Sequence, residues 1–368
     1  MRYNNDKRIV MTLDAGGTNF VFSAIQGEKE IIEPFSLPAA ANSLEEVLLS
    51  IKTGFNRIKQ SLDASPVAIS FSFPGPADYE AGIIGNLENL PVFKGGVALG
   101  PYLEDTFALP VFINNDGDLF AYGEAIAGLL PAMNDLLEKS GSPKRYKNLL
   151  GVTFGTGFGG GIVYRGKLLH GDNSAPGEIN RSSNKLYPGH SAEESISIRG
   201  IKRVFAREAS IPTEESPEPK DIFEIGMGTK PGNKHAAIKA FEELAIVAGN
   251  SIADAVTLID GLVVLGGGLS GAHPLFLSKL VQEMNAPFKT IAGRPLDRLE
   301  IKAYNLHDND ELTSFVKGEV SEITVPFGNK AIKYDPVKRI GVGISSLGTS
   351  KAVSIGAYAY ALNRLDLK

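Results

Sequence analysis

Three glycine-rich loops, each next to a short apolar stretch, constrain this chain more than any other feature. The first begins at Asp14, directly after the stretch 8–13; the others span residues 155–161 and 266–268. Glycine at a strand-to-strand turn leaves backbone N–H groups uncovered, so that a phosphate can lie directly on the main chain. One such turn is usually a plain hairpin. Three of them predict a nucleotide polyphosphate held between two domains.

The loops supply a defined set of candidate nucleotide-binding residues. Asp14 could hold a metal-bound water, and the Thr18 hydroxyl could donate a hydrogen bond to a phosphate oxygen. The glycines would offer their backbone N–H groups. The candidates are Asp14, Gly16, Gly17, Thr18, Gly155, Thr156, Gly157, Gly159, Gly267 and Gly268.

Asp116 is the candidate for proton transfer. It follows Asn115 after the apolar stretch 110–113, where a helix is expected to begin. One interpretation is a helix cap, which the local sequence alone favours. The other is a general base that takes the proton from a substrate hydroxyl as this hydroxyl attacks a phosphoryl group.

Two glutamates are candidates for sugar binding. Glu178, in the run 177–181, could bind sugar hydroxyls or be a solvated loop residue. Glu193 lies with Glu194 near the start of a helix predicted over 191–206, where the helix dipole favours carboxylates in any protein.

The length and pattern of the chain predict two α/β domains. At 368 residues the chain exceeds the size at which single cores stop growing. We expect one domain over 1–130, with a C-terminal helix at about 350–368 packing back on it. The second domain is expected over 131–349, with a strand-rich extension at about 296–345. The stretch 131–147 is predicted to be a surface connection, and 235–259 a long helix.

Composition excludes several classes of function. A net charge of −5 argues against a nucleic-acid partner. The absence of cysteine excludes disulfides, thiol catalysis and cysteine-ligated zinc. No apolar run reaches membrane-spanning length, and the N-terminus has no apolar signal region, so we expect a cytoplasmic protein with no membrane partner. The oligomeric state stays open, and a homodimer is one option.

These residues together resemble the ROK family of sugar kinases and repressors, within the actin-like ATPase superfamily. The resemblance runs from Arg8 to about Gly271 and again from Leu347 to Leu362. Residues 14–18 and 155–161 resemble the two phosphate loops, and 266–268 the loop on the adenosine side. Residues 74–78 are similar to the family's PGPVD turn, 115–118 to its NDAN element, and 177–179 to the start of its GEIGH motif.

The resemblance implies two actin-like (ribonuclease H-like) domains with an active-site cleft between them. It implies a hexose and ATP as substrates, with Mg²⁺ oriented by Asp14 and glucose as the first candidate sugar. Asp116 becomes the expected general base. The implied sugar-binding residues are Gly75, Asn115, Asp116, Glu178 and Glu193.

The chain also departs from the family pattern. Asn180 and Arg181 stand where the family usually has Gly-His, and the stretch from Lys185 to Glu193 replaces its cysteine-rich zinc loop. We therefore expect no structural zinc, since such a site needs thiolates and a histidine at fixed spacing. The sugar-binding loop must then be held by packing and hydrogen bonds, with Arg181 as a candidate for the contacts of the missing histidine.

Two other functions remain for comparison. ROK repressors share this core but carry an N-terminal helix-turn-helix module, and only a few residues precede the first predicted strand here. The acidic charge also argues against a repressor. A sugar sensor without turnover is disfavoured by the intact Asp116 and phosphate loops.

Overall fold

The computed structural model describes residues 3–15, 19–39, 43–85, 87 and 91–367. Gly16, Gly17 and Thr18 of the first glycine loop lie outside these residues. The chain forms two compact units. The first comprises residues 1–128, 161–177 and 347–368, and the second comprises residues 129–160 and 178–346. No sequence feature indicated that 161–177 would group with the first unit.

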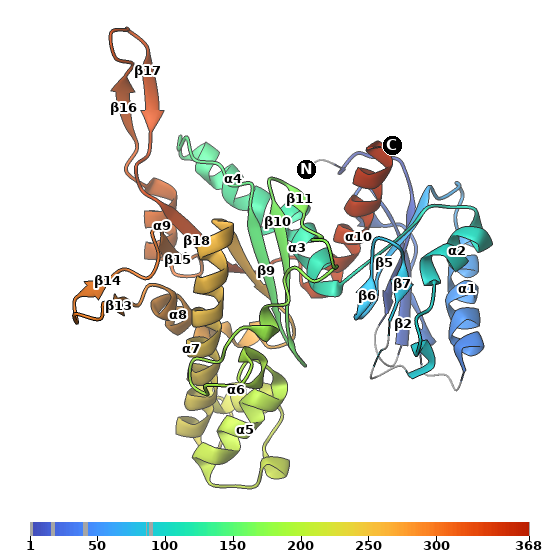
Figure 1. Cartoon of the computed structure of the whole chain (residues 1–368), viewed down its shortest axis with the longest axis horizontal. Coiled ribbons are helices and arrows are strands. Elements are labelled where there is room, and N and C mark those ends of the chain that lie inside the picture. The colour runs from blue at the N-terminus through green and yellow to red at the C-terminus, as the bar shows by residue number, and fades with distance from the viewer. Residues whose placement is uncertain (1–2, 16–18, 40–42, 86, 88–90, 368) are drawn as a thin grey trace. The chain divides into compact units, whose positions relative to one another are not determined.

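A six-stranded sheet organises the first unit (Figure 1). The strands follow the order β3-β2-β1-β5-β8, and β4 also pairs with β2. Strand β1 pairs antiparallel with β2 but parallel with β5, which is parallel to β8. The bounds are β1 (Val10–Ala15), β2 (Asn19–Gln26), β3 (Lys29–Glu30), β4 (Phe35–Pro38), β5 (Ala68–Ser72) and β8 (Val111–Asn114), with a small separate pair β6 (Ala77–Asp78) and β7 (Ile83–Ile84).

Helices cover both faces of this sheet because successive strand side chains point to opposite sides. Helix α1 (Leu44–Gln60) and helix α2 (Leu99–Phe107) contribute Phe55 and Leu103 to a buried apolar core on one face, and η1 (Pro91–Phe93) adds to it. The Ser43 side chain caps α1 by accepting a hydrogen bond from the Glu46 N–H at 3.2 Å. Helix α10 (Thr349–Asp366) packs on β1, β5 and β8.

Two glycines let α10 approach helix α3 (Asp116–Ala127) closely. A Cβ atom on Gly123 would lie 1.9 Å from the carbonyl oxygen of Ala352, and one on Gly356 would lie 2.0 Å from that of Leu119. The backbones of the two helices are therefore in contact. Because α3 begins at Asp116, this contact fixes the helix that carries the candidate base.

The second unit is built on the parallel strands of a second sheet, whose strand β11 and the end of β10 fall in the stretch 161–177 that groups with the first unit. The sheet follows the order β11-β10-β9-β12-β18-β15, and β9, β12, β18 and β15 pair in parallel. The bounds are β9 (Leu149–Phe154), β10 (Phe158–Tyr164), β11 (Lys167–Leu168), β12 (Leu262–Gly266), β15 (Lys302–Asn305) and β18 (Arg339–Ile344). Two hairpins project from this unit in Figure 1: β13 (Phe288–Lys289) with β14 (Pro295–Leu296), and β16 (Ser321–Thr324) with β17 (Ala331–Tyr334).

The long helix α7 organises the helical part of the second unit. It runs from Lys234 to Ile259 and packs against α5, α6 and α8. The remaining helices of this unit are α4 (Leu129–Lys139), α5 (Ile198–Ala209), α6 (Pro219–Met227), α8 (His273–Met284) and α9 (Asn309–Lys317), with 3₁₀ turns η2 (Ile179–Arg181), η3 (Ala192–Glu194), η4 (Thr213–Glu215) and η5 (Ser270–Ala272). No helix in the described part of the chain is both long and apolar enough to cross a membrane.

Two predictions made from the sequence were wrong in detail, and a third missed a helix. The stretch 131–147 is not simply a surface connection, because α4 occupies its first half; Pro131 lies in the first turn, where its missing N–H costs nothing. The helix predicted over 191–206 begins only at Ile198, after the turn η3. The extension 296–345 contains helix α9 as well as strands.

We predict that Gly356→Val destabilises the protein by about 3 kcal/mol, because the new side chain would overlap the α3 backbone. The melting temperature should fall by roughly 5–10 °C. Gly271→Ala is the control, since no atom lies within 4 Å of a Cβ at Gly271. Equal melting temperatures for the two variants would contradict the backbone contact.

Candidate active site

The first unit brings two carboxylates together at one edge of its sheet. The parallel register aligns Asp14 with Ser72, and Ser72 with Asn114. Asp14 is the last residue but one of β1, and Asp116 follows β8 two residues after Asn114. The carboxyl ends of parallel strands meet at one edge of a sheet, so the register brings both acids to the same place.

The surroundings of both carboxylates raise their pKa values. Burial raises the pKa of Asp14, and the nearby charge of Asp116 raises it further. Desolvation by the atoms packed around it raises the pKa of Asp116, against the lowering effect of the hydrogen bond from the Gly117 N–H. The Asp116 side chain nevertheless keeps contact with solvent, which a group that must reach a substrate requires. Within the described residues neither acid has an ion-pair partner, and a bound divalent cation would relieve their repulsion.

Asn115, rather than Asp116, is the N-cap of helix α3. Its Oδ1 accepts a hydrogen bond from the Gly117 N–H at 2.8 Å, and the Asp116 Oδ1 shares the same donor at 2.8 Å. The cap interpretation of Asp116 is therefore corrected: the capping position belongs to its neighbour, and the second oxygen of Asp116 has no hydrogen bond to a described residue.

Tyr79 links Asn115 to the turn that contains Gly75. The Tyr79 hydroxyl donates a hydrogen bond to the Phe73 carbonyl at 2.9 Å and accepts one from Asn115 Nδ2 at 3.4 Å. A Cβ atom on Gly75 would lie 3.1 Å from this hydroxyl. The sequence reasoning missed Tyr79, although its place just after the turn 74–78 was a usable signal.

The second and third glycine loops lie together in the second unit. The Leu269 N–H donates to the Phe154 carbonyl at 2.9 Å, which fastens the loop with Gly267 and Gly268 to the end of β9. Gly267 has a φ of 85°, and a Cβ there would lie 2.3 Å from the Phe154 oxygen. At Gly155 and Gly268, by contrast, a Cβ would meet no atom within 4 Å. These two positions leave open space in front of the backbone, as a phosphate or nucleoside requires.

Gly157 and Gly159 are constrained by the protein's own side chains. A Cβ on Gly157 would lie 2.6 Å from the Glu193 carboxylate, and one on Gly159 would lie 2.6 Å from the Thr153 hydroxyl. Thr156, just before Gly157, is exposed. A substitution at Gly157 or Gly159 would therefore disturb the loop even without nucleotide, so Gly155 is the better position for testing phosphate binding.

Glu193 connects the candidate sugar side to the second glycine loop. Its Oε2 accepts a hydrogen bond from the Phe158 N–H at 3.1 Å, and its Oε1 accepts one from Arg199 Nη2 at 3.0 Å. The turns η2 and η3 pack together, joined by a hydrogen bond from the Ala192 N–H to the Ser182 carbonyl at 2.8 Å. This places Glu178 and Glu193 on neighbouring turns, and the carboxylate of Glu178 is exposed.

Buried Glu243 of helix α7 holds the segment 183–195, which joins these turns. Its carboxylate accepts hydrogen bonds from Tyr187 and Ser195, both at 2.9 Å. It also forms ion pairs with Arg203 at 2.9 Å and Arg207 at 3.3 Å. Both oxygens of this buried carboxylate thus have hydrogen-bond and ion-pair partners, as burial requires.

Asn184 closes the same segment from within. Its amide nitrogen donates to the Ser195 hydroxyl at 3.0 Å and to the Ser191 carbonyl at 3.2 Å. Its oxygen accepts from the N–H groups of Leu186 and Tyr187. Arg181, by contrast, is exposed on η2. Among the described residues no group of three or more His, Cys, Asp or Glu could hold a metal ion.

Comparison with known proteins gives the family. The ROK family profile matches residues 10–308, which is most of the chain. The chain belongs to the ROK family. The predicted α/β fold and the resemblance on which it rested are thereby confirmed.

Three known proteins illustrate what this chain is similar to. A solved structure of a glucokinase from Parabacteroides distasonis is 55% identical, with 99% of each chain covered and a TM-score of 0.91. The glucokinase of Halalkalibacterium halodurans is 26% identical over 74% of this chain and 84% of its own length. The N-acetyl-D-glucosamine kinase of Vibrio vulnificus is 26% identical over 72% of this chain and 85% of its own.

Glu243 contacts the stretch that replaces the cysteine-rich zinc loop of the family pattern. The replaced stretch, Lys185 to Glu193, lies inside the segment held by Glu243 and Asn184. That this protein carries no zinc stays a prediction. Sequence reasoning missed Glu243, because its partners are distant in the chain. It missed Arg199, because its partner Glu193 lies in a turn that was predicted to be part of a helix.

We predict that Glu243→Ala loosens the segment 183–195. The loss should be about 2–3 kcal/mol in the free energy of unfolding, because the arginines can turn to water while the Ser195 hydroxyl loses its acceptor. Hydrogen exchange of the amides in 183–195 should quicken. Glu242→Ala is the control, since Glu242 forms only a partly exposed pair with Lys239. Unchanged exchange in Glu243→Ala would contradict the assigned role.

Gly155→Val should weaken ATP binding at least about tenfold while sugar binding and melting temperature stay as in the wild type. The physical reason is that a Cβ at Gly155 would have no protein atom within 4 Å, so we expect the new side chain to fill the space in front of the loop. Calorimetric titration with ATP and with sugar separates the two effects. Normal ATP affinity in this variant would remove residues 155–159 from nucleotide binding.

Proposed function

We propose that this protein is an ATP-dependent hexose kinase that transfers the γ-phosphate of ATP to the 6-hydroxyl of its sugar. Asp116 is the general base, and glucose is the first candidate substrate. The observation that carries the proposal is the pair Asp14 and Asp116 at one sheet edge, where the charge of Asp116 raises the pKa of Asp14. Phosphoryl transfer needs one carboxylate for the nucleophile and another near the cation that accompanies ATP.

The roles of the two acids follow from their surroundings. Asp116 is accessible, has a free oxygen and has a raised pKa, which suits a base that must release its proton again. Asp14 is more enclosed and would hold Mg²⁺ through a water molecule. Mg²⁺, when bound with ATP, supplies positive charge that offsets the charge of the phosphates.

The glycine loops of the second unit suit the nucleotide. Gly155 and Thr156 would face the phosphates, together with Gly16, Gly17 and Thr18 of the first loop. Gly267 and Gly268 would lie on the adenosine side, and the open space at Gly268 is compatible with that role. Gly157 and Gly159 would shape the loop, because a Cβ on either would lie 2.6 Å from Glu193 or Thr153.

The candidate sugar ligands are amide and carboxylate groups, as hydroxyl recognition requires. Glu178 is free to accept hydrogen bonds from sugar hydroxyls, and Asn115 is oriented by Tyr79 beside Asp116. Glu193 would bind sugar while it holds the Phe158 N–H. Arg181 is the proposed substitute for the histidine of other ROK proteins. The 55% identical glucokinase supports glucose; mannose, fructose and N-acetylated hexosamines are the next candidates.

An ADP-release assay over a panel of hexoses tests the proposal. Glucose should give turnover that depends on Mg²⁺, and 6-deoxyglucose should bind without releasing ADP because it lacks the accepting hydroxyl. Sugar binding without ADP release for every hexose would contradict the kinase and support the sensor without turnover.

Asp116→Asn should lower turnover by roughly 10²–10⁴ with little loss of sugar affinity, because the amide keeps the shape but cannot accept the proton. The pH profile gives a second readout. The base works only when ionised, so wild-type turnover should fall as the pH drops through a pKa above the usual value of about 4.

Asp105→Asn is the matched control, because Asp105 is an exposed residue of helix α2, and this variant should behave as the wild type. An Asp116→Asn variant that keeps more than about half of the wild-type turnover would remove Asp116 from the role.

A further inference from the structure

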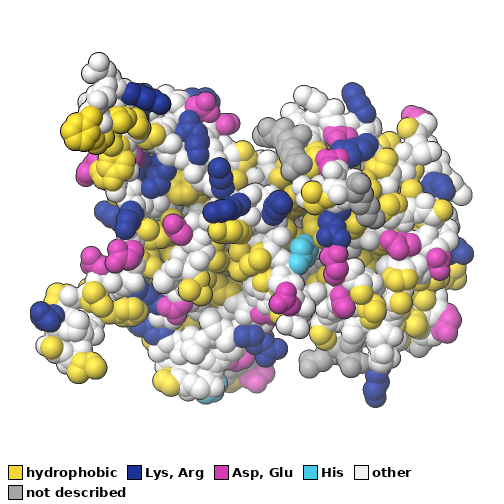
Figure 2. Space-filling view, turned by 45° about the horizontal axis from the view of Figure 1, so that its top comes forward, with side chains coloured by type: hydrophobic (Ala, Val, Ile, Leu, Met, Phe, Trp, Pro, Cys, Tyr) yellow, Lys and Arg dark blue, Asp and Glu magenta, His cyan; other side chains and the backbone are white. Residues whose placement is uncertain are grey.

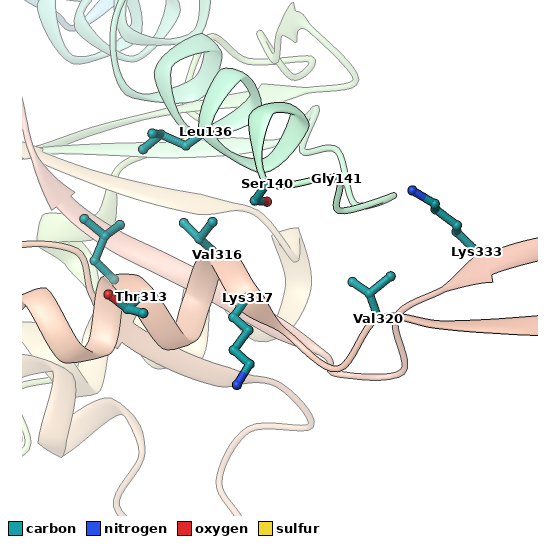
Figure 3. A pocket seen from close by; sticks show the side chains of 9 residues that line it. Leu136, Ser140, Gly141, Thr313, Val316, Lys317, Val320 and Lys333 are labelled. Atoms are coloured by element: carbon teal, nitrogen blue, oxygen red, sulfur yellow. The ribbon is translucent and has the colours of Figure 1, made fainter.

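An apolar groove lies at the foot of the hairpin that β16 and β17 form (Figure 3). Its walls come from the end of α4, from α9 and from the base of the hairpin, all within the second unit. Its volume is about 670 Å³, which is within the range of pockets that bind small molecules. The apolar lining residues are Leu136, Leu312, Val316 and Val320.

The apolar walls of the groove are only partly covered by the protein. Leu136 is 38% exposed and Val320 is 39% exposed, while Leu312 and Val316 are half-buried. Removing apolar surface from water is favourable in proportion to its area. A ligand with an apolar part would therefore gain free energy by filling the groove.

The polar groups of the lining favour an anion. They are the ammonium groups of Lys317 and Lys333 and the hydroxyls of Ser140 and Thr313; none of the described lining residues is Asp or Glu. Both hydroxyls donate to carbonyls of their own helices, at 2.8 Å and 2.7 Å respectively. The two ammonium groups are therefore the hydrogen-bond donors that the side chains of this lining can offer a ligand.

Lys333 is directed at the groove and not at its neighbour in the hairpin. The strand register places it opposite Glu322, where opposite charges usually attract each other. Within the described residues its ammonium group nevertheless forms no ion pair. Its Nζ lies 3.9 Å from the position of a Cβ atom on Gly141, at the other wall, and Figure 3 shows the side chain pointing that way. A carboxylate in the groove would give this cation the partner that it lacks.

The surroundings of the groove also favour negative charge in a ligand. Lys317 lies in the last turn of α9, and Figure 2 shows Lys and Arg side chains beside hydrophobic ones at this end of the second unit. Two neighbouring acids already have partners. Asp335 forms an ion pair with Arg339 at 2.7 Å, and Glu311 accepts a hydrogen bond from the Asn305 N–H at 2.7 Å.

We propose that this groove binds a small amphipathic carboxylate with an unbranched apolar tail. The carboxylate pairs with Lys333, and the charge of Lys317 attracts it from the α9 side. The tail covers the apolar walls. A small ligand is favoured over a protein partner because the volume is that of a small-molecule site. The site uses no residue assigned to sugar or nucleotide, so it does not depend on the proposed kinase function.

Titration calorimetry of the whole chain with hexanoate, octanoate and decanoate tests the proposal. Each buried methylene adds a similar free energy, so the affinity should rise about threefold per methylene. Acetate should not bind, and octanol should bind more weakly than octanoate because it lacks the charge. Added salt should weaken the binding of octanoate and not that of octanol. Equal affinities for hexanoate and decanoate would overturn the proposal.

Lys333→Gln removes the charge while keeping most of the side-chain stem. The dissociation constant of octanoate should rise about threefold to fivefold, and that of octanol should not change. Lys330→Gln is the matched control, because Lys330 is exposed in the same hairpin but does not line the groove. The same octanoate affinity in both variants would remove Lys333 from the site and overturn the proposal.

Val320→Glu tests the apolar wall by placing a carboxylate in the groove. Octanoate binding should weaken at least about tenfold, because the ligand would meet a like charge as well as lose apolar contact. Ile323→Glu is the control, since Ile323 is 47% exposed and lies outside the groove. Both positions are partly exposed, so equal melting temperatures should show that both variants fold. Normal octanoate affinity in Val320→Glu would place the ligand elsewhere and overturn the proposal.

The same titrations distinguish other occupants of the groove. An octanoate affinity that falls as the protein concentration rises would show that a second copy of the chain covers the groove. Binding of a peptide of alternating Glu and Leu, without binding of any of the three fatty acids, would show a site for an acidic protein segment. Either result would overturn the proposal.

Discussion

The carboxylate of Glu243 is the interaction on which the candidate site depends most. It receives two arginines, a tyrosine and a serine, and through Tyr187 and Ser195 it holds the segment 183–195. That segment carries Glu193, whose carboxylate accepts the Phe158 N–H of the second glycine loop. A single buried acid thus orders the proposed sugar side and the proposed phosphate side of the second unit. Its charge is compensated by groups that reach partly into water, so the arrangement avoids the full cost of burying an ion pair.

In the first unit, strand register positions the candidate residues. Asp14, Ser72 and Asn114 align at the ends of three parallel strands, and Asp116 begins the helix that α10 holds through Gly123 and Gly356. The pair of acids is therefore placed by backbone hydrogen bonds and by helix contact. Changes in side-chain packing would move this pair of acids little. Such rigidity suits a group that must meet a substrate hydroxyl at hydrogen-bond distance.

Features that depend on local pattern could be predicted from the sequence. The glycine loops and the helix over 235–259 follow from turn chemistry and periodicity, and the structure has α7 where this helix was expected. Glu243 and Arg199 could not be found this way, because their roles depend on partners brought near by the fold, whereas Tyr79 was missed although it directly follows the turn 74–78. Helix α9 was missed although a signal existed: Asp308 caps it by accepting from the N–H groups of Asp310 and Glu311. The site residues themselves stay proposals, and the helix-cap interpretation of Asp116 failed because Asn115 fills that position.

The central claim is that a loop held by Glu243 and Asn184, without zinc, supports hexose phosphorylation. The most direct measurement is glucose 6-phosphate formed per ADP by purified, tag-free protein whose zinc content is determined in the same sample. The account predicts one sugar phosphate per ADP with Mg²⁺ present, with less than stoichiometric zinc and no loss of rate after a zinc-selective chelator. Stoichiometric zinc, or a rate abolished by that chelator while Mg²⁺ is in excess, would contradict it.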